Sequence, residues 1–164
     1  MTEAGEGEVD YGRTRFRLKY FFFPKNNHWL KRITLVFSFV LFDYIVTLVL
    51  CHTSHEEANV YVRVFMESLG IPLGLTLFVL MANLPIYMSL SLDSHIVRLP
   101  YRIGAIAESS VDVAFAWFVA GLHFAGATSW FWQAPGLMRQ LLGSFFYLFM
   151  AFLIVKPHSP HYDY

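Results

Sequence analysis

The residues with the clearest chemical potential are polar side chains inside a hydrophobic stretch. Asp43 lies near the middle of the run from Ile33 to Cys51, and Thr47 and Cys51 follow it at four-residue steps. Side chains at this spacing share one face of a helix, so the three residues form a polar stripe. A carboxylate within a membrane-spanning helix is costly. Asp43 is therefore either a proton-relay or ligand-binding group, or a hydrogen-bond anchor between helices, and both interpretations stay open.

A second polar stripe occurs in the third hydrophobic run, at spacings of three and four residues. It consists of Glu108, Asp112, Ala116, Ala120, His123 and Ala127. Small residues let helices approach closely and polar residues bond across the contact, so we expect this face to pack inside a bundle. Arg98 and Arg102 are candidate partners for the two acids. We expect His123 to be a hydrogen-bonded packing residue rather than a ligand.

A third cluster follows the first hydrophobic run, where His52, His55 and Glu56 are close in sequence. Imidazole and carboxylate groups can hold a divalent metal. The spacing differs from the metalloprotease motif, in which the two histidines are four residues apart. The favoured interpretation is a capped helix start, with Thr53 and Glu56 or Ser54 and Glu57 as the capping pair. No cofactor is expected.

One combination of these residues resembles a known pattern. Asp43-x-x-x-Thr47 precedes a short polar loop with Glu57-x-Asn59, and a second hydrophobic run follows. Over about residues 40–92, this order resembles an uncharacterised family of small prokaryotic multi-helix membrane proteins that carry a Glu-x-Asn-Pro element. In this chain Val60 stands where that element has proline. The resemblance implies one cluster of Asp43, Thr47, Glu57 and Asn59 and a prokaryotic cytoplasmic membrane, but it implies no reaction.

The elements that must position these groups are hydrophobic helices. The 164 residues are 56% hydrophobic and only 15% charged, against about a quarter charged in soluble domains. Four runs, at about 33–51, 71–92, 106–132 and 137–155, reach the roughly 20 residues that a membrane-spanning helix needs. The sequence therefore predicts an all-α integral membrane four-helix bundle. The balance of 12 basic and 12 acidic residues argues against nucleic-acid binding.

The distribution of basic residues predicts the topology. Seven Lys and Arg residues precede the first run, and Arg98, Arg102 and Lys156 fall on the same side. Since that side is cytoplasmic by the positive-inside rule, we expect both termini there. The expected organisation is a cytoplasmic tail with a basic interfacial segment at 1–32, a transmembrane domain at 33–155 and a cytoplasmic tail at 156–164.

Two local features complete the expected architecture. Apolar residues at helical spacing predict a short amphipathic helix in the outer loop, from about 55 to 69, and Gly70 supplies its stop signal. In the second run, Pro85 frees a backbone carbonyl, and Asn83 is close enough to satisfy it.

Three functions fit this sequence, in decreasing order of preference. The first is a non-catalytic accessory or scaffold subunit of a membrane complex, with the lipid bilayer and other subunits or further copies as partners. The second is an oligomeric proton-coupled transporter of a small solute that uses the intramembrane carboxylates. The third is a metal-dependent membrane enzyme. Convergence of Asp43, Glu57, Asn59 and the third-run stripe on a cavity would favour transport or catalysis, whereas separate contacts would favour a scaffold.

Overall fold

The computed structural model describes residues 27–93 and 101–155. The predicted tails up to residue 26 and from residue 156, and the connection 94–100 with Arg98, lie outside this part of the chain. The side chains of Arg102 and Glu108 lie outside it as well.

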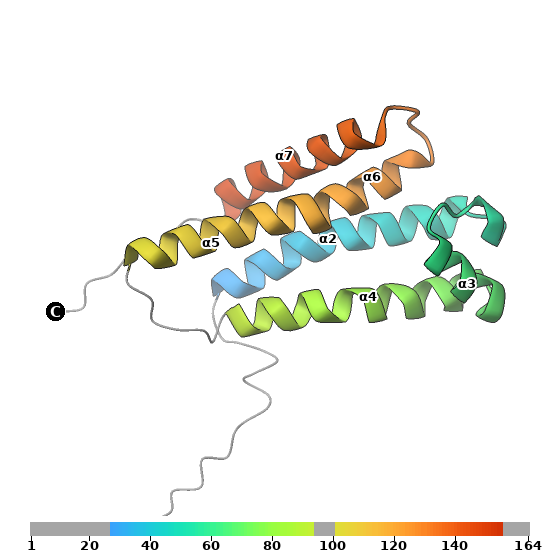
Figure 1. Cartoon of the computed structure of the whole chain (residues 1–164), viewed down its shortest axis with the longest axis horizontal. Coiled ribbons are helices and arrows are strands. Elements are labelled where there is room, and N and C mark those ends of the chain that lie inside the picture. Colours follow the sequence, from blue (N-terminus) through green and yellow to red (C-terminus); the bar gives the residue numbers. More distant parts are fainter. Residues whose placement is uncertain (1–26, 94–100, 156–164) are drawn as a thin grey trace, which may run out of the picture.

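All regular structure in the described residues is helical (Figure 1). In chain order the elements are α2 (Asn27–Leu50), the 3₁₀ turn η1 (Ser54–Glu56), α3 (Val60–Leu69), α4 (Ile71–Asp93), α5 (Tyr101–Phe115), the π-helical segment η2 (Ala116–Gly121), α6 (Leu122–Ser129) and α7 (Gly136–Ile154). Helices α5, η2 and α6 follow one another without a break and form a single rod.

Four of these units are long and apolar enough to cross a membrane. The qualifying stretches are Trp29–Leu50, Ile71–Ser91, Ser109–Ser129 and Gly136–Ile154. The prediction of an all-α chain with four such helices is therefore confirmed. The first helix begins at Asn27, so residues 27–32 are helical rather than part of the predicted tail, because no helix breaker separates them from the apolar run.

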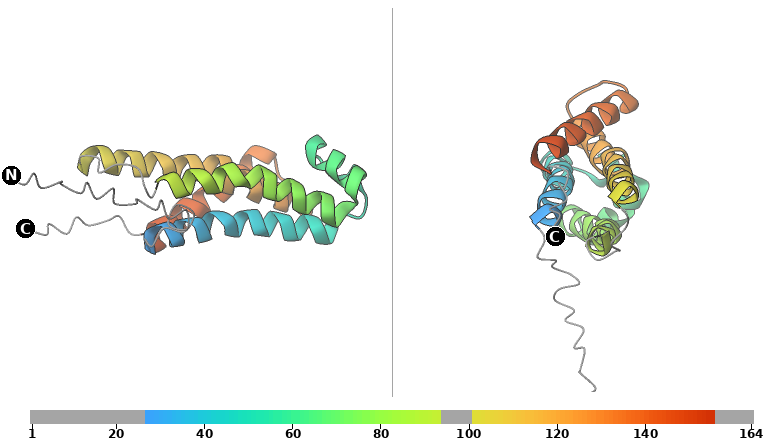
Figure 2. Two further views of the ribbon diagram at one scale, coloured as in Figure 1. Left: turned by 90° about the horizontal axis from the view of Figure 1, so that it is seen from below. Right: turned by 90° about the vertical axis from the view of Figure 1, so that its left-hand side faces the viewer.

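The helices form an elongated bundle in which neighbouring spans alternate in direction. Helices α2 and α5–α6 run one way, and α4 and α7 run the other way (Figure 1). Consequently α2 begins and α7 ends at the same end of the bundle (Figure 2). Helix α2 is central, since it packs against α4, α6 and α7. Its residues Val36, Phe39 and Val40 are buried in the main core together with Leu90 and Tyr147.

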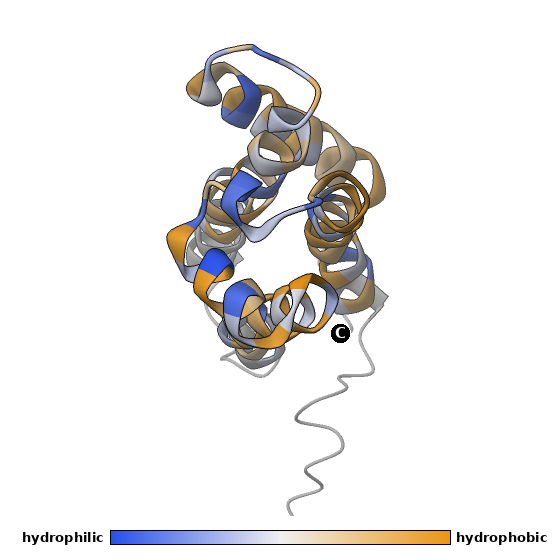
Figure 3. Ribbon diagram, turned by 90° about the vertical axis from the view of Figure 1, so that its right-hand side faces the viewer, coloured by the Kyte–Doolittle hydropathy of each residue, from blue (hydrophilic) through white to orange (hydrophobic). Residues whose placement is uncertain are grey.

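Helix α3 closes the opposite end by folding back on α4. Gly70 joins them with a φ of 82°, a backbone conformation that glycine adopts without strain. Gly74 lies so close to the Phe65 carbonyl that a β-carbon would collide with it. Seen from this end, the ribbon includes hydrophilic residues in the turns and at helix ends, whereas much of the helices is hydrophobic (Figure 3).

The helix expected from residue 55 begins five residues later. Asn59 is its N-cap, because its Oδ1 accepts a hydrogen bond from the Tyr61 N–H at 3.0 Å. The Thr53 and Glu56 pair caps the separate turn η1 instead. Of the two predicted capping pairs, Thr53 and Glu56 therefore cap η1, whereas Ser54 and Glu57 do not cap α3.

Candidate functional site

The first polar contact between α2 and α5 lies toward the end where α2 begins. Arg32 Nε donates to Asp112 Oδ1 at 2.8 Å, and Arg32 Nη2 donates to Oδ2 at 3.2 Å. The Arg32 side chain is 10% exposed and that of Asp112 is 22% exposed. Such a two-point contact fixes orientation as well as charge. Arg32, which the sequence analysis counted only toward topology, is therefore a partner of Asp112.

The second contact lies further along the same two spans. Asp43 Oδ2 and His123 Nδ1 are 2.8 Å apart, and both side chains are half-buried. Gly126 follows one turn after His123, and a β-carbon there would lie 2.9 Å from Asp43 Oδ1. The glycine therefore leaves room for the carboxylate. In both contacts the residues are 80 positions apart. The separation is the same because α2 and α5–α6 run in the same direction.

The polar contacts between α2 and α5–α6 form a seam. Two further hydrogen bonds of α2 lie toward its α3 end, one on the seam and one to α4. Trp130 Nε1 donates to Thr47 Oγ1 at 3.2 Å. The Tyr44 hydroxyl lies 3.0 Å from Thr76 Oγ1 of α4. Thr47 is buried, so its hydroxyl is satisfied within the protein rather than by surrounding solvent or lipid.

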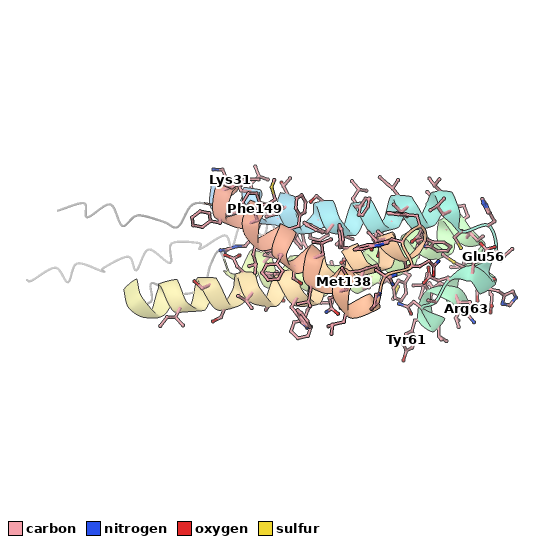
Figure 4. All side chains as sticks on the ribbon, turned by 90° about the horizontal axis from the view of Figure 1, so that it is seen from above. Lys31, Glu56, Tyr61, Arg63, Met138 and Phe149 are labelled. Carbon is pink, nitrogen blue, oxygen red and sulfur yellow. The ribbon has the colours of Figure 1, made fainter. Side chains whose placement is uncertain are left out.

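A cavity of about 580 Å³ lies beside this seam, between α4 and the η2–α6 segment. Its polar lining residues are Asp43, Tyr44, Thr47, Glu56, Glu57, Asn59, Asn83, His123, Ser129 and Trp130. Helix α2 forms one side, and the connection into α3 forms the end wall. Glu56, Tyr61 and Arg63 mark this end of the bundle, whereas Lys31 and Phe149 lie toward the other (Figure 4). The volume is within the range of ligand pockets, about 300–1,000 Å³.

The cavity brings together residues from both sequence stripes and from the resemblance pattern. Asp43, Thr47, Glu57, Asn59 and His123 all line it. Asp112 does not, and the side chain of Glu108 is outside the described residues.

The position of the Glu57 side chain is set locally. Its Oε1 accepts from the Asn59 N–H at 2.8 Å, and the Glu57 carbonyl accepts from Arg63 Nη2 at 2.6 Å. These bonds fix the residues before α3 in the end wall of the cavity.

The histidine and glutamate cluster forms a capped turn in the structure. Glu56 Oε2 accepts from the backbone N–H of His52 at 2.8 Å and of Thr53 at 3.3 Å, and these bonds lower the pKa of Glu56 below its ordinary value. The exposed His55 has its Nδ1 3.8 Å from Glu67 Oε1. Within residues 27–93 and 101–155, no group of three His, Cys, Asp or Glu side chains is arranged to hold a metal.

Asn83 is a cavity residue that the sequence analysis assigned a different task. Its Nδ2 donates to the Val79 carbonyl at 2.9 Å, rather than to a carbonyl freed by Pro85. Its Oδ1 is buried and has no hydrogen-bond partner in the part of the chain that the structure describes. The available signal was an amide in a 22-residue run without charge.

The site is thus a partly open cavity with polar and apolar lining residues, and the Asp43 and His123 contact lies on its wall. Its titratable groups come from the second half of α2, from the connection between α2 and α3, and from α6. No protein-family model, no curated protein and no solved structure matches the chain.

Proposed function

We propose that the protein is a proton-coupled transporter of a small solute, with Asp43 and His123 as its proton-binding pair. The observation that carries this proposal is the 2.8 Å contact between their side chains on the wall of the cavity. Carboxylates and histidines within membrane spans are the usual members of proton relays. Histidine also changes charge within the physiological pH range.

The two walls of the cavity favour movement over a static role. On α4, Pro85 lies between the lining residues Asn83 and Ile86, and proline removes one backbone hydrogen bond from a helix. On the opposite wall, Phe118 belongs to the π-helical segment η2, a feature frequent at functional sites. A transporter must open its cavity to each side in turn, and these walls contain irregular helix segments that can bend.

The membrane setting follows from the same proposal. The side bearing most basic residues is cytoplasmic, so the cavity and α3 face outward. The resemblance to the prokaryotic family then gives a cytoplasmic membrane of a prokaryotic cell. Four spans are few for a complete pathway, so the working unit is an oligomer, and the bilayer and further copies of the chain are its partners.

Proton flux in proteoliposomes tests this function. The wild type and the Asp43→Asn variant are reconstituted at equal density, a potassium diffusion potential is imposed, and internal pH is followed with an enclosed dye. We expect flux in the wild type and its loss in Asp43→Asn, because an amide cannot take up a proton in this pH range. Glu67→Gln, which removes a carboxylate of α3 outside the cavity lining, is the matched control. Equal flux through wild type and Asp43→Asn contradicts the proposal.

A second candidate is an accessory subunit of a membrane complex. It is favoured by the exterior of α7, where Phe145, Phe149 and Phe152 are exposed. Aromatic side chains of this kind can pack against a neighbouring subunit as well as against lipid. Native mass measurement after mild detergent extraction tests it, and a lone monomer contradicts it.

A further inference from the structure

We infer that Ser144 and Gln140 of α7 are positioning residues for the contact between Asp43 and His123. Both side chains bond to the π-helical segment η2, which directly precedes the helix that carries His123. The inference concerns the geometry of this contact, and only its consequence for proton flux rests on the function proposed above.

The two side chains of α7 reach the first two carbonyls of η2. Ser144 Oγ lies 2.9 Å from the Ala116 carbonyl and 2.8 Å from the Gln140 carbonyl of its own helix, so its single proton is shared between two acceptors. Gln140 Nε2 donates to the Trp117 carbonyl at 3.2 Å. A donor from outside a helix draws a carbonyl away from the helix axis, which suits the wider π-helical turn.

The π-helical turn decides which residue of α6 faces α2. Each N–H of a π-helix bonds to the carbonyl five residues earlier, so η2 holds one residue more than an α-helix of the same length. If η2 became α-helical while α5 stayed in place, every position of α6 would be taken by the preceding residue, a rotation of about 100°. Leu122 would then replace His123 opposite Asp43, and the contact would be lost.

Ser144 also opposes this change by its position. Gly121, the last residue of η2, packs so closely on α7 that a β-carbon would collide with Ser144 Oγ and would lie 2.8 Å from the Gln140 carbonyl. After the change, Ala120 would bring a β-carbon to the place of Gly121. Ser144 therefore disfavours the α-helical form by contact and stabilises the π-helical form by its hydrogen bond.

Disulfide trapping in nanodiscs shows which residue of α6 faces position 43. A β-carbon at Gly126 would lie 3.3 Å from Asp43 Cγ, the place that the sulfur takes in Asp43→Cys, so Asp43→Cys with Gly126→Cys is within disulfide reach. A second pair, Asp43→Cys with Ala125→Cys, detects the α-helical form. Both pairs are made with Cys51→Ser, which removes the chain's own cysteine.

The ratio of the two oxidation rates measures the rotation of α6. With Ser144 and Gln140 intact, the Gly126→Cys pair should form at least about tenfold faster than the Ala125→Cys pair. Ser144→Ala should lower this ratio about fivefold, and adding Gln140→Met, which keeps the chain length but removes the N–H donor, should lower it further.

The matched control changes the next residue at both positions. Leu141→Ala with Phe145→Ala alters side chains that are exposed on the exterior of α7, and the ratio should stay as in the parent. An unchanged ratio in Ser144→Ala overturns the inference. A fall of both rates by the same factor also overturns it, because it would show that α7 supports the bundle without setting the rotation of α6.

Proton flux, measured on the chain with its native Asp43 and Gly126, separates this inference from the proposed function. Flux should fall in Ser144→Ala with Gln140→Met and persist in the Leu141→Ala and Phe145→Ala control. A changed trapping ratio with no Asp43-dependent flux in the wild type overturns the transporter and keeps the positioning role. Asp43-dependent flux with an unchanged trapping ratio keeps the transporter and overturns the positioning role.

Discussion

The two polar contacts between α2 and α5–α6, Arg32 with Asp112 and Asp43 with His123, have the same sequence separation and the same shortest distance of 2.8 Å, but they lie in different surroundings. Arg32 and Asp112 lie beside the apolar core, and Arg32 is buried. Asp43 and His123 lie on the wall of a cavity. An arginine stays charged at every relevant pH, whereas a histidine does not.

This difference indicates two roles for one type of contact. A pair with a permanent charge and two hydrogen bonds holds the spans in register. A pair with a titratable member and access to a cavity can exchange its proton or bind a ligand. Disturbing both ends of the seam in the same way compares these roles directly, and further changes disturb the half toward α3 alone.

The largest effect is expected at the arginine pair. Asp112→Ala removes the carboxylate that two Arg32 nitrogens contact, and breaking a buried pair costs about 3–5 kcal/mol. Asp43→Ala should cost less, about 1–3 kcal/mol, because its histidine partner can become neutral. Denaturant unfolding in detergent measures both, and equal losses would remove the distinction between the two ends.

A smaller loss of stability is expected at Gly126. A β-carbon there meets the Asp43 carboxylate at 2.9 Å, so Gly126→Ala should displace it at a cost of about 1–3 kcal/mol and abolish proton flux. Gly136→Ala is the control, because no atom lies within 4 Å of its added carbon. Normal flux in Gly126→Ala would show that the position of Asp43 is unimportant.

The reactivity of the Cys51 thiol depends on the charges of Glu56 and Glu57, which line the cavity. It can be measured without changing a residue of the seam. Burial raises the pKa of this thiol above the ordinary 9.0, and the charges of Glu57 and Glu56 raise it further. The folded protein therefore favours the protonated thiol. The contribution of this preference to the free energy of unfolding is fully present below pH 9.0 and is lost as the pH rises through the raised pKa.

Alkylation of the folded protein should accordingly be slower than that of the detergent-denatured chain, since the thiolate is the nucleophile. Glu57→Gln should accelerate it at mildly alkaline pH by removing one of the charges. Iodoacetamide labelling followed by mass spectrometry gives both rates. A rate unaffected by Glu57→Gln would exclude an electrostatic link between this residue and Cys51.

The smallest effect is expected at Val60, the first residue of α3. Its N–H needs no partner within the helix, and Asn59 before it is extended, so proline fits there. Val60→Pro should change the free energy of unfolding by less than about 1 kcal/mol, in the stabilising direction. Val64→Pro, inside the same helix, should cost about 3 kcal/mol. A large loss of unfolding free energy in Val60→Pro would contradict the inference that proline fits the first position of α3.

The four spans were predictable because their signal is local. Each spanning helix corresponds to a continuous apolar run of the sequence, and such a run can be recognised without knowing which helices pack beside it. The pairing of Asp43 with His123 was not predictable, since it depends on the direction and rotation of two helices that α3 and α4 separate in the sequence. The π-helical segment η2 between Asp112 and His123 also changes the rotation that a regular helix would give.

Local signals also failed where two of them overlapped. Glu56 and Glu57 each accept backbone hydrogen bonds, and only the three-dimensional structure shows that they belong to different turns. Asn83 was assigned to Pro85 because of its proximity in sequence, whereas its amide bonds to the carbonyl four residues earlier. Neither choice could be made from residue type and spacing alone.

The separation of 80 residues between the paired groups has a consequence for biosynthesis. Arg32 and Asp43 leave the ribosome long before Asp112 and His123 exist. At about 5–20 residues per second, the delay is about 4–16 seconds. During this time the first span carries two polar groups that the bilayer disfavours. The first span therefore has to accommodate both groups without these partners until the third span has been made.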